Sequence, residues 1–176
     1  SDVYKRQAIG APNGGSTEYG ETSDLGLVFI WKWDGSTWKI TAEIGPGTQE
    51  FGHTVNLNKS PDPSIDGTVV LIGEEYNNNG CGAVSVYEYD GTSWNQKGQT
   101  IVGSSEDYME TSASINSDGT IFACGSWKRN RVLVYEWNDS SSTWTLKSNI
   151  SRPSGASGSH FGSTTQMTGD GLTIVI

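Results

Sequence analysis

The stretch Asp66-Gly67-Thr68-Val69-Val70-Leu71-Ile72 decides the fold, because the chain repeats its pattern at a fixed spacing. The same Asp-Gly pair returns at Asp118 and at Asp170, which is 52 residues further on each time. A short apolar run follows the pair in all three copies. A period near 50 residues is typical of solenoids, propellers and arrays, so the sequence predicts a repeat protein.

Each repeat carries the signals of four short antiparallel strands. An Asp-Gly pair between alternating apolar runs is typical of a β-hairpin, because glycine adopts the positive φ that the tight turn requires. An aromatic strand follows the hairpin, and a polar turn then leads to a single tryptophan. The aromatic strands are 28–33, 84–89 and 132–137, and the tryptophans are Trp38, Trp94 and Trp144. Four strands in a unit of this length are typical of a propeller blade.

The aromatic strands favour a blade over a half-solvated sheet, because both of their faces are apolar. We therefore predict an all-β fold, a partial β-propeller of four-stranded antiparallel blades in an open arc of about three blades. Residues 1–7 resemble the translation of a sequencing-adapter end, with a genuine polar tail as the alternative, and stay outside the fold reasoning. The predicted boundaries are 8–50 for a partial first blade, 51–108 for the second, 109–160 for the third and 161–176 for the truncated start of a fourth.

Composition excludes two classes of partner. The formal net charge is −9 and the pI is about 4.5, which argues against nucleic acid and anionic membranes. The basic residues of 128–131 are expected to lie in a solvated loop. No apolar run approaches the roughly 20 residues of a membrane span. We expect no nucleic-acid partner and no membrane span.

Catalytic and metal-binding patterns are missing from the sequence. His53 is expected on a strand and His160 in a loop, without the serine and acid that a triad needs. Glu74 and Glu75 should point to opposite sides of a strand, so they do not form an acid–base pair. Cys124 occupies a core position and Cys81 a loop, and two free thiols are expected, with a bridge between blades as the alternative. We expect no enzyme, no catalytic residue and no metal.

Short motifs carry a resemblance to a known family. Ile9-Gly10-Ala11-Pro12, Phe51-Gly52 and Phe161-Gly162 resemble the FG-GAP repeat of integrin-type propellers, in the divergent form common in bacterial and algal surface proteins. The integrin type implies calcium bound by an Asp-x-Asp-x-Asp-Gly hairpin. Only the final Asp-Gly is kept in 116–119 and 168–171, while 58–66 has more oxygens but two prolines and a different spacing. We expect no cofactor, with calcium as the unfavoured alternative.

The resemblance implies a non-enzymatic extracellular or cell-surface interaction and adhesion module with a protein or carbohydrate ligand. Such ligands meet the face formed by the loops after the second strands and the links between blades, and aromatic residues dominate binding hot spots. The candidate binding residues are Tyr19, Tyr76, Tyr108 and Trp127. Two alternatives stay open: a fragment of a propeller glycosidase or lyase with its catalytic residues in missing blades, and a structural spacer.

Three further expectations concern processing and behaviour. Asn58, Asn138 and Asn149 each begin an Asn-x-Ser pattern and are candidate glycosylation sites. A signal peptide would lie upstream of the first residue, so its absence does not argue against export. The open arc leaves apolar blade faces and the strand 172–176 unpaired, so we expect the chain to self-associate.

Overall fold

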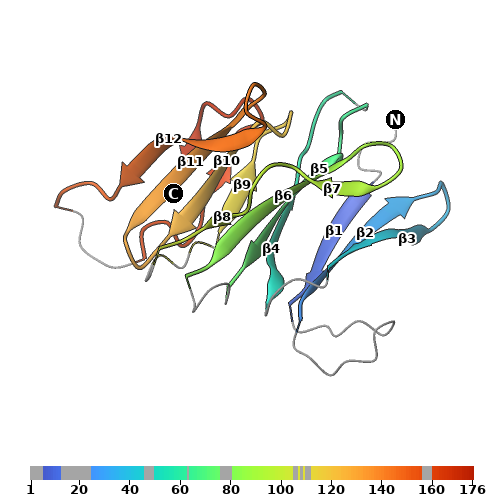
Figure 1. Cartoon of the computed structure of the whole chain (residues 1–176), viewed down its shortest axis with the longest axis horizontal. Coiled ribbons are helices and arrows are strands. Elements are labelled where there is room, and N and C mark those ends of the chain that lie inside the picture. The colour runs from blue at the N-terminus through green and yellow to red at the C-terminus, as the bar shows by residue number, and fades with distance from the viewer. Residues whose placement is uncertain are drawn as a thin grey trace.

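A computed structural model describes residues 6–12, 25–45, 50–62, 64–75, 81–104, 107, 109, 112–155 and 160–176. These residues form strands and turns without a helix, which confirms the predicted all-β class. Every strand pair is antiparallel. Figure 1 shows the sheets side by side, from β1–β3 on the right to β9–β12 on the left.

The strands form four sheets in chain order. The first contains β1 (Arg6–Ala11), β2 (Leu27–Trp33) and β3 (Trp38–Ile44). The second contains β4 (Phe51–Leu57), β5 (Val69–Glu74), β6 (Ala83–Tyr89) and β7 (Trp94–Gln96), and β8 (Ile101–Val102) also pairs with β6. The third contains β9 (Ala113–Ile115), β10 (Ile121–Ser126), β11 (Arg131–Asn138) and β12 (Thr143–Ser151). The last contains β13 (Gln166–Met167) and β14 (Ile174–Val175). Arg6 and Gln7, which the sequence assigned to the adapter-like segment, pair with β2 as the first residues of β1.

The Asp-Gly pairs share a positive glycine φ and one backbone hydrogen bond in all three copies, although the first loop is longer than the other two. Gly67, Gly119 and Gly171 have φ of 63°, 71° and 72°, a region that favours glycine. Each glycine N–H donates to the carbonyl of the residue that opens its turn. These bonds run to Asn58 (3.1 Å), Asn116 (3.2 Å) and Thr168 (2.9 Å). The 52-residue repeat of the sequence is therefore a repeat of backbone structure.

The core lies between the sheets, and alternate residues of β5 face different neighbours. Val70 and Ile72 pack with Val28 and Ile30 of the first sheet. Val69 and Leu71 instead join a cluster that includes Phe122 and Cys124 of the third sheet. A third cluster joins β10 and β11 to Met167 of β13. The second sheet therefore buries both of its faces, as a blade between two neighbours should.

Two motifs of the sequence meet at the contact between sheets. Gly10 of β1 lies against Gly52, and a Cβ on Gly10 would lie 1.9 Å from the carbonyl oxygen of Gly52. Gly125 of β10 lies in the same way against Gly162, with 1.8 Å between an added Cβ and the carbonyl oxygen. Gly52 and Gly162 both have φ near 90°. The Phe-Gly motif thus presses its backbone against a glycine of the preceding sheet.

Candidate functional site

Charged, aromatic and metal-ligand-type side chains gather where β5 and β10 end and β4 begins. We call this the loop end, and it comprises residues 50–53, 75, 107, 127–131 and 160–163. The pairing of Phe51 with Glu74, and of Ser126 with Arg131, sets these segments side by side at one edge of the sheets. The Asp-Gly hairpins lie at the opposite edge, because the strands between the two edges are antiparallel.

Trp127 is the candidate binding residue that falls within the described part of the chain. It directly follows β10, is half-buried, and stacks on His160 with 5.0 Å between the ring centroids and 20° between the planes. Lys128 places its ammonium group 5.7 Å from the Trp127 ring. The three side chains form an aromatic platform with a cation placed over the indole ring. Tyr19, Tyr76 and Tyr108 lie outside the described residues.

Glu50, His53 and Glu75 form a second group at the loop end. Their ligand-type atoms all lie within 4.8 Å of one another, and His53 Nε2 is 3.5 Å from Glu75 Oε2. Glu75 raises the pKa of the Glu50 carboxyl, because the two groups share a hydrogen bond; partial burial and charge repulsion add to this. This group has the donor atoms of a metal site, which sequence reasoning did not find because His53 was taken as an isolated strand residue.

A bulge in β4 brings these three side chains together. Phe51 pairs with Glu74 but Thr54 pairs with Gly73, so Gly52 and His53 are extra residues on their strand. Glu50 has φ of 60°, and its carbonyl accepts a 3.0 Å hydrogen bond from His53 N–H. Bulges re-aim side chains at strand ends. The same turn recurs at His160, with φ of 85° and a 3.0 Å bond from Ser163 N–H.

Asp107 is the buried ionic centre of the loop end, with 2% of its surface exposed. Its carboxylate accepts hydrogen bonds from Ser104, from Ser126 Oγ at 2.9 Å and from Arg131 at 2.7 Å. Arg129 lies 3.3 Å away. Burial raises the pKa of Asp107, but the hydrogen bonds outweigh it and the net pKa is lowered.

The solvated loop expected at 128–131 is found at Lys128 and Arg129, which are exposed, but not at Arg131, which is the first residue of β11 and joins the Asp107 network. Arg131 keeps only 24% of its side chain exposed and Arg129 keeps 43%, because both reach toward the same carboxylate. The network joins the link that follows β8 to the ends of β10 and β11. It therefore holds the backbone that presents Trp127 and Lys128. The sequence offered no signal for it, since Asp107 and Arg131 are distant along the chain.

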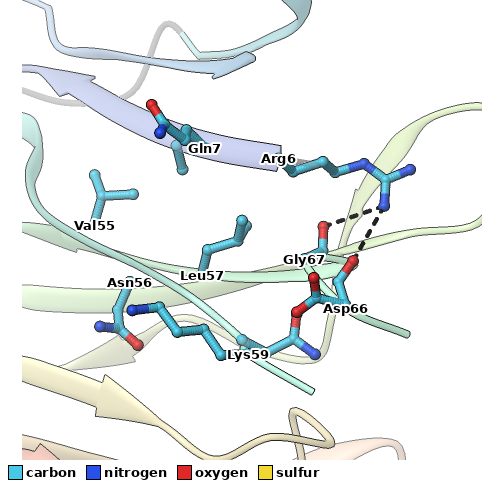
Figure 2. A pocket seen from close by; sticks show the side chains of 10 residues that line it. Arg6, Gln7, Val55, Asn56, Leu57, Lys59, Asp66 and Gly67 are labelled. Carbon is cyan, nitrogen blue, oxygen red and sulfur yellow. Dashed lines mark hydrogen bonds between the residues drawn. The ribbon is translucent and has the colours of Figure 1, made fainter. Parts of the chain in front are cut away.

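A cleft of about 360 Å³ lies toward the opposite edge, between β1 and β4. Figure 2 shows Arg6 extending over it toward Asp66 and Gly67, whose carbonyls are 3.4 and 3.5 Å from the guanidinium. Val55 and Leu57 supply apolar walls. A smaller cleft of about 180 Å³ lies among β4, β9 and β13. Of the residues that the structure describes, Asp66 is the one carboxylate that lines the larger cleft, and no carboxylate lines the smaller one. Neither cleft therefore offers a carboxylate pair from these residues.

The hairpin aspartates are occupied by their own turns. Asp118 Oδ1 accepts from Thr120 N–H at 3.1 Å, and Asp170 Oδ1 accepts from Leu172 N–H at 3.0 Å. On the outer hairpins Asp34 and Asp90 each accept two backbone N–H groups. These bonds lower the pKa of both carboxyl groups. The largest contribution is the side-chain hydrogen bond from Lys39 for Asp34, and the N–H of Ser93 for Asp90. The absence of calcium remains a prediction.

The three candidate glycosylation sites differ in accessibility. Asn58 is 1% exposed, and its Nδ2 donates to the carbonyls of Ile65 (2.8 Å) and Ser117 (2.9 Å). This nitrogen holds the first hairpin together and is not accessible in the folded chain, which corrects the expectation for Asn58. Asn138 and Asn149 are exposed. The thiols of Cys81 and Cys124 are both free, and burial raises the pKa of Cys124.

Comparison with known proteins supports the fold. No family model and no curated protein matches the chain. A solved structure from Bacteroides fragilis, of a protein whose proposed activity is that of a 6-phosphogluconolactonase, matches with a TM-score of 0.51 and 14% identity. The match covers 71% of this chain and 33% of that protein, so the chain spans about a third of its length. At this identity the likeness concerns the fold alone. Among the described residues, no helix is long and apolar enough to cross a bilayer. The chain is therefore part of a β-propeller-type fold built from four-stranded antiparallel sheets.

Proposed function

We propose that the chain is a non-enzymatic interaction module of an extracellular or cell-surface protein, built from FG-GAP-like propeller repeats. The FG-GAP assignment is supported by the contact of Gly52 from the Phe-Gly motif with Gly10 from the Gly-Ala-Pro motif. The repeat of this contact at Gly125 and Gly162 supports the same assignment.

One observation carries the binding role, namely the aromatic platform at the loop end. Trp127 is half-buried, so part of its ring remains accessible to a ligand. Its stacking on His160 fixes the ring orientation, and the Asp107 network holds the backbone that follows it. Pre-ordered aromatic anchors suit protein and carbohydrate ligands, because little conformational entropy is lost on binding.

The test is a binding screen of the intact chain against a glycan array and a panel of purified extracellular proteins. We expect a ligand whose affinity falls at least tenfold in Trp127→Ala, in line with a hot-spot residue. The matched control is Leu146→Ala, which removes a 55% exposed apolar side chain from the outer strand β12. Equal loss in both variants, or retained affinity in Trp127→Ala, would show that the platform is not the binding surface.

A further inference from the structure

Glu50, His53 and Glu75 combine the donors that first-row divalent metals use in proteins. One imidazole nitrogen and two carboxylate groups converge at the loop end, and one ligand atom from each lies within 4.8 Å of the other two. Imidazole and carboxylate ligands suit zinc and its neighbours, whereas calcium and magnesium favour oxygen alone. The presence of a histidine therefore separates this group from an ordinary cluster of surface acids.

The distances fit a single ion. Zinc holds nitrogen and oxygen ligands at about 2.0–2.2 Å, so two ligands in tetrahedral geometry lie about 3.4 Å apart. His53 Nε2 and Glu75 Oε2 are already 3.5 Å apart. The remaining separations, at most 4.8 Å, have to close by no more than about 1.4 Å to reach that value, which side-chain rotation supplies.

The contact between the two carboxyl groups also favours a cation. One carboxylate oxygen of Glu50 and one of Glu75 lie within 4.8 Å of each other, and two anions at this distance repel. A divalent ion bound between them cancels the repulsion. The bulge that carries Glu50 and His53 is a backbone feature, so the ligands are brought together before any ion arrives.

We propose that Glu50, His53 and Glu75 bind one divalent transition-metal ion of the zinc class. Three protein ligands leave at least one coordination position open to water or to a group of a docking partner. The site is independent of Trp127, since the aromatic platform is formed by residues after β10 and before β13.

The experiment titrates the metal-stripped chain with zinc chloride by calorimetry in a non-coordinating buffer. We expect one zinc per chain and at least a tenfold weaker affinity in His53→Ser, Glu50→Gln and Glu75→Gln, because even outer-shell changes cost metal sites about 10–100-fold. His53→Ser should fold normally, since Ser163 occupies the equivalent position of the recurring turn. Glu50→Gln removes the charge but can still donate a hydrogen bond to Glu75.

The matched control is His160→Ala, which removes the other of the two histidines and leaves the group intact. It should bind zinc like the parent chain, and far-ultraviolet circular dichroism should show the same strand content in every variant. Zinc binding weaker than about 1 mM in the parent chain would overturn the proposal. So would equal affinity in His53→Ser, or a zinc-dependent dimer in light scattering that shows the ion to bridge two chains.

Discussion

Replacing Gly125 by alanine tests the contact on which the arrangement of the sheets depends. The added Cβ would lie 1.8 Å from the carbonyl oxygen of Gly162 and 2.8 Å from its carbonyl carbon. Cβ atoms essentially never approach other atoms within 3.0 Å, so the two backbones must separate by about 1.2 Å, the difference between 3.0 and 1.8 Å. Both atoms belong to backbone and cannot rotate away.

The size of the effect follows from the cost of overpacking. Inserting a methyl group into a tight contact costs about 1–3 kcal/mol, and a backbone obstacle places Gly125→Ala near the upper end. For a chain of this length each kcal/mol lowers the melting temperature by about 2–4 °C, so about 3 kcal/mol corresponds to roughly 6–12 °C. Gly10→Ala, which would place its Cβ 1.9 Å from the Gly52 carbonyl oxygen, should lower it by a similar amount.

Thermal unfolding followed by circular dichroism measures the effect, and two controls isolate its cause. Ser163→Ala changes an exposed side chain in the same turn and should stay within about 0.5 kcal/mol. Gly91→Ala adds a Cβ with nothing within 4 Å, at a φ of 104°, and reports the cost of backbone strain alone. If Gly125→Ala melts within 2 °C of the parent chain, the close contact does not hold the sheets in place.

Three further predictions follow from other parts of the structure. Asp107→Asn should destabilise the chain because it leaves Arg131 without its counter-charge. We expect a cost of about 2–3 kcal/mol, somewhat below the range for a fully buried pair. Folding lowers the pKa of Asp107, so its contribution to the free energy of unfolding is present above its unfolded pKa near 4. That contribution is lost as the pH falls through the folded pKa. Asp107→Asn should therefore flatten the acid limb of a stability profile measured from pH 7 to pH 2. Secreted from a eukaryotic host, the chain should carry a glycan at exposed Asn138, so that Asn138→Gln lowers the intact mass by one glycan, whereas unchanged mass would contradict the assignment. Leu172 and Val175 are 83% and 68% exposed, so replacing both by lysine should reduce self-association in multi-angle light scattering, and a parent chain that is already monomeric at high concentration would contradict this.

Strand content and the repeat could be predicted because they depend on local chemistry. Each Asp-Gly pair requires a turn with positive φ, and Gly67, Gly119 and Gly171 all adopt it. The apolar residues on both faces of the aromatic strands also predicted burial between two neighbours, and β6 confirms it, since Val84 and Val86 join one cluster and Tyr87 packs against another. Such features need only neighbouring residues, so a single sequence contains them.

The loop end could be predicted only in part, because its chemistry joins residues that are distant along the chain. Trp127 was identified from its position after a strand, but its stacking partner His160 lies in the next link. The ionic contact of Asp107 with Arg131 was missed, since the two residues are 24 positions apart along the chain. Asn58 matched a glycosylation pattern, yet its amide is used in tertiary hydrogen bonds that no local pattern reveals.

The recurring turn shows why the repeat says little about function. The backbone at Glu50-Phe51-Gly52-His53 and at His160-Phe161-Gly162-Ser163 is the same, with positive φ at the first and third residues and a 3.0 Å bond across the turn. The phenylalanine and glycine serve the contact between sheets, so the fold constrains them. The flanking residues differ between the two copies: one copy carries two metal-type ligands, and the other carries the histidine that stacks on Trp127. Structure is therefore encoded in the constant positions of each repeat and chemistry in the variable ones, so the differences between copies are where binding residues should be sought.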